Sequence, residues 1–324
     1  MASRFRWAPL LRLLLGLFLM ALLVRSVGLE HLRSALDPLH SHPGWIAAAL
    51  SLTFAALATG AVRWHAILQI LGLSTPFFRT CRGYFIGQFF NAFFFGACGG
   101  DLARAVLAAR DHPEKRTEAV TSVFLDRAIG LGITLVFGCA RLPFHLRDFS
   151  AHPEARLALV LMAVFLAAAA AFIALFFTRN LYDRLPGQRR VQPFERLAPL
   201  LRRTYEAIYL FRRNGRHLLW PGVLSMANLL LLTAAAAALA RALELHLPFG
   251  DLLTVFPVIT VLAAVPLTPG SLGVRETLYV HLLAPFGIAA GPALMLSLLG
   301  YLIATFWSVA GGLFLLRPAG DGTP

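Results

Sequence analysis

Long stretches of the chain contain no charged residue, and the remaining charges gather between them. A transmembrane helix needs about 20 apolar residues, and continuous apolar runs favour helices, since a membrane-spanning strand alternates apolar and polar positions. Two further apolar stretches, residues 7–24 and 119–140, contain internal charges at Arg12 and at Asp126 and Arg127. The pattern predicts an all-α polytopic membrane protein. The charge-free runs cover residues 44–62, 83–100, 157–178, 218–240, 252–274 and 277–316.

Composition excludes most soluble classes. Residues of the AVILMFWYC set make up 58% of the chain and charged residues 14%, where about 25% is typical. The net charge is +13, but all basic residues except Lys115 are arginines, and they follow the ends of the apolar runs. We therefore read them as topogenic and expect no nucleic-acid partner. Three dispersed cysteines, Cys81, Cys98 and Cys139, predict neither a disulfide framework nor a zinc site, and no cofactor is expected.

The distribution of arginines predicts the topology. Arg4 and Arg6 precede residues 7–24, which we read as a retained first span with the N-terminus inside. Residues 179–216 hold ten arginines, and a full crossing by residues 83–100 would place them outside. The conflict disappears if residues 83–110 enter and return on one side as a re-entrant hairpin buried in protein.

Counting the crossings in the same way requires a second re-entrant hairpin over residues 252–288, which enters the membrane from the opposite side. Pro257, Pro266 and Pro269 support a broken helix there, because proline lacks an amide donor. We thus predict a single domain, residues 1–324, with two opposed hairpins and both termini in the cytoplasm. Opposed broken helices form the substrate sites of many transporters. The six full spans are expected near residues 7–24, 44–62, 119–140, 157–178, 218–240 and 293–316.

The connection over residues 179–217 predicts an amphipathic helix on the inner leaflet. Apolar residues recur there at helical spacing among many arginines, which attract anionic lipid. A topogenic charge block without a specific ligand explains the same arginines. The apolar positions are Phe194, Leu197, Leu201, Tyr205 and Ile208.

Charges at membrane depth are costly and usually pair or line a wet cavity. Two of the sets lie at predicted hairpin tips behind glycines, where free helix amides and an arginine favour a phosphate. The alternative is that these charges only neutralise one another, and that Asp126 and Arg127 are interfacial anchors. The three acid–arginine sets are Asp101 with Arg104, Asp126 with Arg127, and Arg275 with Glu276.

Two other polar groups have competing interpretations. Asn91, within an aromatic run, offers an amide to a head group, although an interhelical hydrogen bond is its commoner role. Histidines and an aspartate in the first outer loop suggest a metal, but they lack a rigid spacing, and we predict no metal site. These loop residues are His31, Asp37, His40 and His42.

Several short motifs occur in a fixed order along the chain. Over residues 10–315 the set resembles the lysylphosphatidylglycerol synthase transmembrane-region family, the flippase-like module of multiple peptide resistance factor proteins. One departure is Phe94-Phe95-Gly96-Ala97-Cys98, where the family usually shows Leu-Pro, so glycine is expected to make the first hairpin's bend. The motifs are Arg63-Trp64, Tyr84-x-x-Gly87-x-x-x-x-Asn91, Gly99-Gly100-Asp101-x-x-Arg104-Ala105, Asp126-Arg127-x-x-Gly130 and Pro269-Gly270-x-x-Gly273-x-x-Glu276.

The resemblance implies a function. In full-length synthases of the family, a cytoplasmic domain adds lysine to phosphatidylglycerol and the membrane module moves the product between leaflets. This chain ends soon after Leu316, so we expect no synthase activity. It is expected to translocate a phospholipid or lipid-linked phosphate in a bacterial inner membrane. Arg104 and Arg275 would hold the phosphate, with Asp101, Asp126, Arg127, Glu276, Asn91 and Arg63 completing the substrate-binding set.

Two other functions stay open at this point. One is a membrane-embedded transferase acting on a lipid-linked phosphate, although no Asp-x-Asp, H-E-x-x-H or P-loop pattern occurs. The other is a non-transporting partner of envelope-lipid synthesis. Anionic phospholipid head groups are the expected partners, and a homodimer or a biosynthetic partner protein is equally compatible with the sequence.

Overall fold

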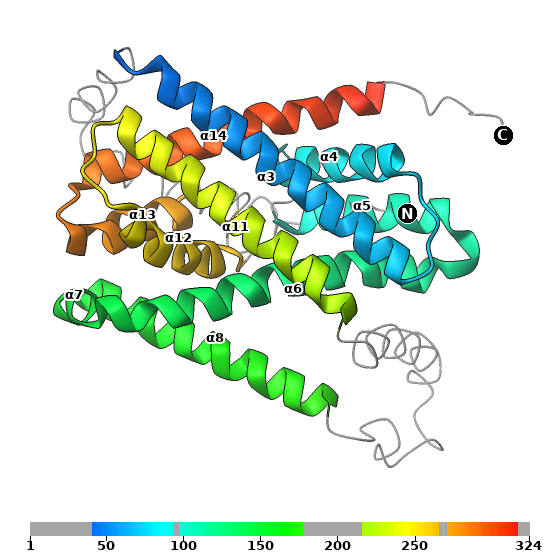
Figure 1. The fold of residues 1–324 in the computed structure, drawn as a ribbon, viewed down its shortest axis with the longest axis horizontal. Coiled ribbons are helices and arrows are strands. Elements are labelled where there is room, and N and C mark those ends of the chain that lie inside the picture. The colour runs from blue at the N-terminus through cyan, green and yellow to red at the C-terminus, as the bar shows by residue number, and fades with distance from the viewer. Residues whose placement is uncertain (1–40, 94–96, 178–215, 266–267, 269–270, 317–324) are drawn as a thin grey trace, which may run out of the picture.

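The computed structural model describes residues 41–93, 97–177, 216–265, 268 and 271–316, and these ranges form helices joined by turns (Figure 1). Five helical segments of this part are long and apolar enough to cross a bilayer. The predicted all-helical class is therefore confirmed. The long helices are α3 (Pro43–Ile70), α6 (Arg116–Arg141), α8 (Pro153–Phe177), α11 (Arg216–Ala242) and α14 (Ala290–Leu316).

These helices coincide with five of the six predicted full spans. The predicted span at residues 7–24 lies outside the described residues, as does nearly all of the predicted linker at 179–217. One boundary differs in a way that matters for the site. We expected the second span near residues 44–62, but α3 continues to Ile70 and buries Arg63.

Four shorter helices form two pairs, and the members of each pair contact each other. At 1.5 Å per residue they are about 15–25 Å long, shorter than the ~30 Å hydrocarbon core of a bilayer. Pro257 lies inside its helix and does not end it, whereas residues 266 and 269 lie outside the described residues. The pairs are α4 (Phe77–Phe93) with α5 (Ala97–Asp111), and α12 (Phe249–Ala263) with α13 (Val274–Leu283).

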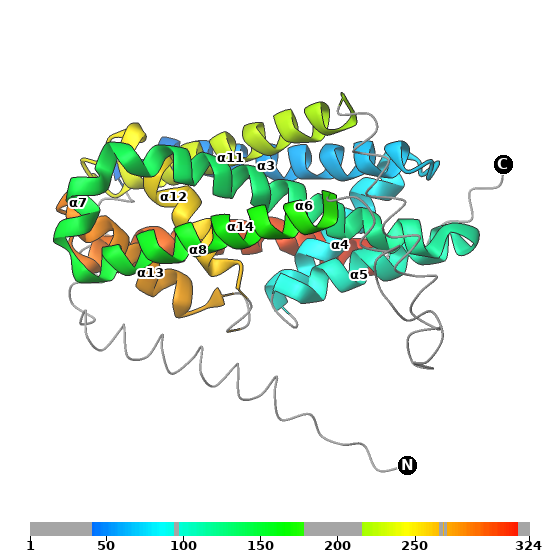
Figure 2. The same ribbon diagram turned by 90° about the horizontal axis from the view of Figure 1, so that it is seen from below.

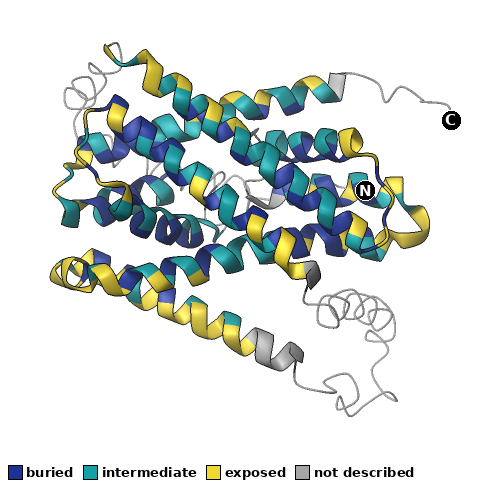
Figure 3. Cartoon of the chain, in the orientation of Figure 1, coloured by how far each residue is buried: buried dark blue, intermediate teal, exposed yellow. Residues whose placement is uncertain are grey.

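The two pairs lie at opposite ends of the molecule. In Figures 1 and 2, α4 and α5 occupy one end and α12 and α13 the other. Helices α3 and α11 pack against each other along their lengths, and α14 contacts both α4 and α13. Figure 3 shows α12 largely buried, whereas α8 at the edge is exposed over most of its length. The long helices thus hold the short pairs in place.

A compact turn after α6 fixes the second pair. The segment consists of a 3₁₀ turn, Leu142–His145, and the short helix α7 (Leu146–Ala151). The His145 ring lies 3.1 Å from a carboxylate oxygen of Asp148 and 3.6 Å from one of Asp251 at the start of α12. The buried Phe149 packs edge-on against Phe286, which follows α13.

The first pair is held by a close contact between α4 and α14. A Cβ atom on Gly311 would collide with the backbone carbonyl of Phe85. Small residues let membrane helices approach this closely, so that dispersion contacts replace the missing hydrophobic driving force. Gly311 therefore sets the separation between the first pair and the last long helix.

This contact makes a stability prediction. The substitution Gly311→Ala should lower the free energy of unfolding by about 1–3 kcal/mol, because overpacking forces the backbones apart. Thermal unfolding in detergent measures the change. Gly132→Ala in α6 is the control, since no atom lies within 4 Å of the position that its Cβ would take. Equal stability of both variants would contradict the close packing of α4 on α14.

Candidate functional site

A buried carboxylate stands at the centre of the largest charged cluster. Asp126 in α6 is 2% exposed and accepts hydrogen bonds from two arginines. Nε of Arg63 in α3 donates to its Oδ1 at 2.7 Å, and a terminal nitrogen of Arg104 in α5 donates to its Oδ2 at 2.9 Å. Arg63 also donates to the hydroxyl of Ser225 in α11 at 3.0 Å. The cluster therefore joins four helices.

Two further charged residues form the outer rim of this cluster. Arg104 donates to Oδ1 of Asp101 at 2.7 Å, and the other Asp101 oxygen lies 3.9 Å from a guanidinium nitrogen of Arg127. The Asp101 side chain is 23% exposed and that of Arg127 37%, whereas that of Arg104 is only 7% exposed. The cluster is thus dry at its centre and accessible at Asp101 and Arg127.

Aromatic rings fix the orientation of Arg104. Its guanidinium carbon lies 5.1 Å from the centre of the Trp64 ring and 5.2 Å from that of Tyr84. Such cation–π contacts are worth about 2 kcal/mol or more when desolvated. Trp64 is itself held by a hydrogen bond from its indole nitrogen to the Ser122 hydroxyl at 3.1 Å. Arg104 is therefore held by two carboxylates and two aromatic rings of the protein.

The glycines of the sequence motifs make room for these side chains. A Cβ on Gly87 would press into the Arg104 side chain, and a Cβ on Gly100 would collide with the Gly87 carbonyl. A Cβ on Gly130 would lie 3.0 Å from a guanidinium nitrogen of Arg63. Gly87 and Gly100 therefore allow α4 and α5 to approach closely around Arg104, and Gly130 leaves room for the guanidinium of Arg63.

Asn91 occupies the position that we considered for a bound anion. Its Oδ1 accepts a hydrogen bond from the Gly100 amide in the first turn of α5 at 2.8 Å. The amide at this turn is thus satisfied by the protein. Asn91 joins the end of α4 to the start of α5 in the manner of an interhelical hydrogen bond.

The formal charge of the first cluster is positive. Three guanidinium groups, of Arg63, Arg104 and Arg127, face the two carboxylates of Asp101 and Asp126, which leaves +1. The two arginines bonded to Asp126 are buried, so the surplus falls on Arg127, the most exposed of the five side chains. Arg127 shares the Asp101 carboxylate with Arg104, at the longer distance of 3.9 Å.

A second cluster lies at the start of α13. Glu276 is fully buried and accepts hydrogen bonds from Arg275, from the Ser297 hydroxyl of α14 at 3.1 Å and from the Gly273 amide at 2.7 Å. Gly273 has φ of +80°, a conformation that favours glycine. The Glu276 carboxylate thus occupies the anion position at this helix start, and Arg275 remains 20% exposed.

Tyr301 in α14 connects the two clusters. The guanidinium carbon of Arg275 lies 4.8 Å from the centre of its ring. Its hydroxyl donates to the carbonyl of Ala92 at 3.3 Å, next to Asn91 at the end of α4. The second cluster therefore touches the inner end of the first helix pair through one side chain.

The two clusters lie at comparable distances from opposite ends of the molecule. Helices α3, α5, α6 and α11 each have one end on the same side of the molecule in Figure 1. The central residues of the first cluster lie seven to ten positions from these ends. At 1.5 Å per residue this is about 10–15 Å. Glu276 and Ser297 of the second cluster lie about 10 Å from the ends of α13 and α14 on the other side of the molecule.

The structure brings together most of the sequence-predicted site residues. The first cluster contains Arg63, Asn91, Asp101, Arg104, Asp126 and Arg127, and the second contains Arg275 and Glu276. One pairing differs, since Asp126 bonds Arg63 and Arg104 instead of its neighbour Arg127. Adjacent helical residues point about 100° apart, so they do not face each other.

Sequence reasoning missed the neutral partners in both clusters. Three of them are isolated hydroxyls within apolar runs, and Ser122 follows Thr121. Nothing else in the sequence marks them, because serine and tyrosine are also common as packing residues. The missed residues are Ser122, Ser225, Ser297 and Tyr301.

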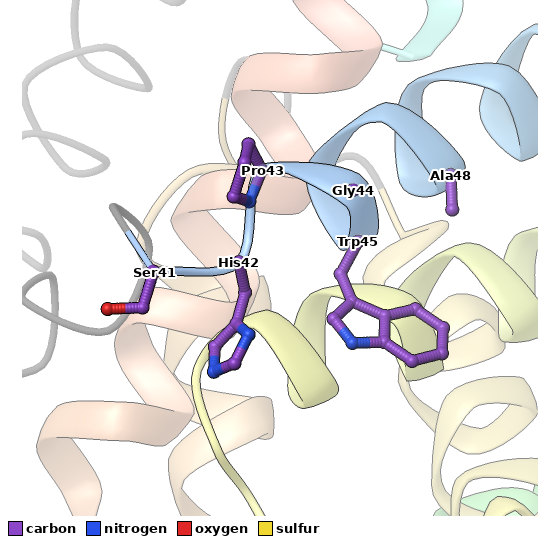
Figure 4. A pocket seen from close by; sticks show the side chains of 6 residues that line it. All are labelled: Ser41, His42, Pro43, Gly44, Trp45 and Ala48. Carbon is purple, nitrogen blue, oxygen red and sulfur yellow. The ribbon is translucent and has the colours of Figure 1, made fainter.

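An open hollow at the start of α3 is separate from both clusters. It is lined by Ser41, His42, Pro43, Gly44, Trp45 and Ala48 (Figure 4). Nε2 of His42 lies 3.1 Å from a Glu244 oxygen, and Trp45 is 46% exposed, as is typical of interfacial anchors. Among the described residues, no three His, Cys, Asp or Glu side chains are placed to hold a metal ion. The other members of the histidine-containing loop lie outside the described residues: His31, Asp37 and His40.

The buried pairing predicts a large loss of stability at one position and almost none at the next. Asp126→Asn should lower the free energy of unfolding by about 3–5 kcal/mol, because two buried guanidinium groups lose their shared anion. Arg127→Gln should change it by no more than about 0.5 kcal/mol, since the side chain is partly exposed and its nearest carboxylate is 3.9 Å away. Thermal unfolding in detergent compares the two. A similar loss in both variants would show that Asp126 is not the structural centre.

Comparison with known families gives one finding. The profile of the family described as lysylphosphatidylglycerol synthase TM region matches residues 10–312. It covers the transmembrane region, and no catalytic domain is detected. No curated protein matches the chain. The motif resemblance is confirmed, and with its long apolar helices the chain is a multi-pass membrane protein. It belongs to the lysylphosphatidylglycerol synthase transmembrane-region family.

Proposed function

We propose that the protein binds an anionic phospholipid by its head-group phosphate and moves it between the leaflets of a bacterial inner membrane. The observation that supports this most directly is the surplus positive charge of the first cluster, located on the partly exposed Arg127. A cation at membrane depth is costly unless an anion accompanies it. A phosphate is the anion that a guanidinium binds best, through two parallel hydrogen bonds.

The roles within the substrate-binding set follow from burial. The phosphate first meets Arg127, because this guanidinium is 37% exposed. Arg104, which we expected to hold the phosphate, already donates to Asp101 and Asp126, so it contacts the ligand only after Asp101 moves away. Asp101 therefore holds the place of the phosphate in the empty protein, and Arg63 and Asp126 keep Arg104 in position.

The second cluster provides the next binding step. Among the described contacts of the second cluster, the charged groups are Arg275 and the buried Glu276. Of these two, Arg275 is partly exposed. Its guanidinium stacks on Tyr301, whose hydroxyl reaches the end of α4. A phosphate leaving the first cluster finds a second guanidinium on the far side of this tyrosine. With one phosphate site in each cluster, a charged head group would cross the membrane in two shorter steps.

The short helix pairs support the re-entrant topology that this path requires. Each of the four short helices is shorter than the ~30 Å hydrocarbon core, and the two pairs lie at opposite ends of the molecule. In the proposed arrangement, α4 and α5 enter from the cytoplasmic side and α12 and α13 from the other side. Both termini are then cytoplasmic, as the arginine distribution predicts.

Leaflet exchange tests the transport function. Purified protein is reconstituted into vesicles with fluorescent phosphatidylglycerol, and dithionite quenching reports exchange. We expect Arg127→Gln and Arg275→Gln each to slow exchange by at least about tenfold, because each loses one charge-assisted hydrogen bond to phosphate, worth about 1.5–3 kcal/mol.

The matched control is Arg156→Gln, an exposed arginine at the start of α8, which should exchange lipid as fast as the unaltered protein. Thermal unfolding confirms that each variant is folded. If both cluster variants matched this control, the charge clusters would have no part in transport.

Cysteine labelling tests the topology. In a variant without the native cysteines, Phe78→Cys at the start of α4 and Arg110→Cys at the end of α5 should react with an impermeant maleimide from the same side. Both native residues are exposed. Phe249→Cys at the start of α12 should react from the opposite side. Labelling of positions 78 and 110 from opposite faces would mean that one helix of the first pair crosses the membrane completely.

A further inference from the structure

Arg127 lies on the outward face of α6 beside exposed apolar side chains. Val120, Phe124 and Arg127 follow one another at spacings of four and three residues, which places them on one helix face. Val120 is 47% exposed and Phe124 51%. Both lie between Arg127 and the start of α6 at Arg116. An apolar strip thus leads along α6 to the partly exposed guanidinium.

Helix α5 contributes a matching strip. Leu102, 64% exposed, follows Asp101 directly, and Val106, 43% exposed, lies one turn further along α5. Helices α5 and α6 contact each other, and buried alanines and a valine of the two helices belong to one apolar cluster. These packed residues are Ala105, Ala108, Ala119 and Val123. The seam between α5 and α6 therefore has a buried apolar part, and both helices carry exposed apolar residues near Asp101 and Arg127.

We propose that this seam is the lateral access site for a diacyl phospholipid. The phosphate meets Arg127 and Asp101 at the rim of the first cluster, while the acyl chains stay in the bilayer against Leu102, Val106 and Phe124. The inference rests on the proposed function, and adds to it the route of access and the class of substrate. The ligand is a lipid with a net negative head group, taken sideways from the membrane.

Charge and apolar surface together select this ligand. The surplus +1 on the rim favours a head group with one net negative charge over a zwitterionic one, since a phosphocholine carries its own cation. A soluble phosphate has no acyl chains, so its binding would not cover the exposed apolar residues of α5 and α6. A diacyl lipid satisfies both features at once.

Photo-crosslinking tests the access site. p-Benzoylphenylalanine is placed at position 124, or at position 306 of α14, where Phe306 is 60% exposed and serves as a control. The protein is reconstituted in phosphatidylcholine vesicles with a minor fraction of phosphatidylglycerol, both tagged on an acyl chain. We expect captured lipid at position 124 to be enriched in phosphatidylglycerol about fivefold over position 306, the factor that one basic side chain near the surface contributes.

Adding Arg127→Gln should reduce the enrichment at position 124 to the level at position 306. Excess soluble glycerol phosphate should leave it unchanged. Equal enrichment at both positions, persistence of the enrichment in Arg127→Gln, or its loss on adding glycerol phosphate would each overturn lateral access.

Leaflet exchange measured on the same vesicles separates this inference from the proposed function. If exchange depends on Arg127 but position 124 shows no enrichment, the protein transports lipid by another route and the access site is wrong. If position 124 is enriched and exchange is insensitive to Arg127 and Arg275, the access site stands and transport through the clusters is wrong.

Discussion

The bond between one buried carboxylate and two arginines organises this protein. Asp126 is almost completely enclosed, and the guanidinium groups of Arg63 and Arg104 reach it from different helices. In a bilayer, apolar surface gives helices little reason to associate, so polar contacts and close packing determine which helices meet. An unpaired charge at this depth would be costly. The positions of α3, α5 and α6 are therefore mutually dependent.

Much of the fold was predictable because the bilayer restricts composition so strongly. Charge-free runs at residues 44–62 and 218–240 indicated helices, and helices α3 and α11 occupy them. The prediction failed where a charge does not mark a helix end. The charge-free run at residues 44–62 ends before Arg63, yet α3 continues to Ile70, because the Asp126 carboxylate replaces the water that a loop arginine would need.

The candidate site was predictable in membership but not in connectivity. The cost of charge at membrane depth singled out Asp101, Arg104 and Arg127 from the sequence. It did not show that Arg104 is enclosed between Trp64 and Tyr84, because that depends on the packing of α3 against α4. Nor did it show that Asn91 and Glu276 already occupy the helix-start amides. Which charges remain accessible follows only from the three-dimensional arrangement.

The surplus charge on Arg127 has an electrical consequence. Arg127 lies near the middle of α6, so it is expected deep in the field of the membrane. A membrane voltage acts on each elementary charge with about 2.3 kcal/mol per 100 mV. If the cluster binds a singly negative lipid, as we propose, the complex is formally neutral and its movement would be insensitive to voltage. Without that lipid the cluster carries one positive charge, so a membrane potential would bias its position.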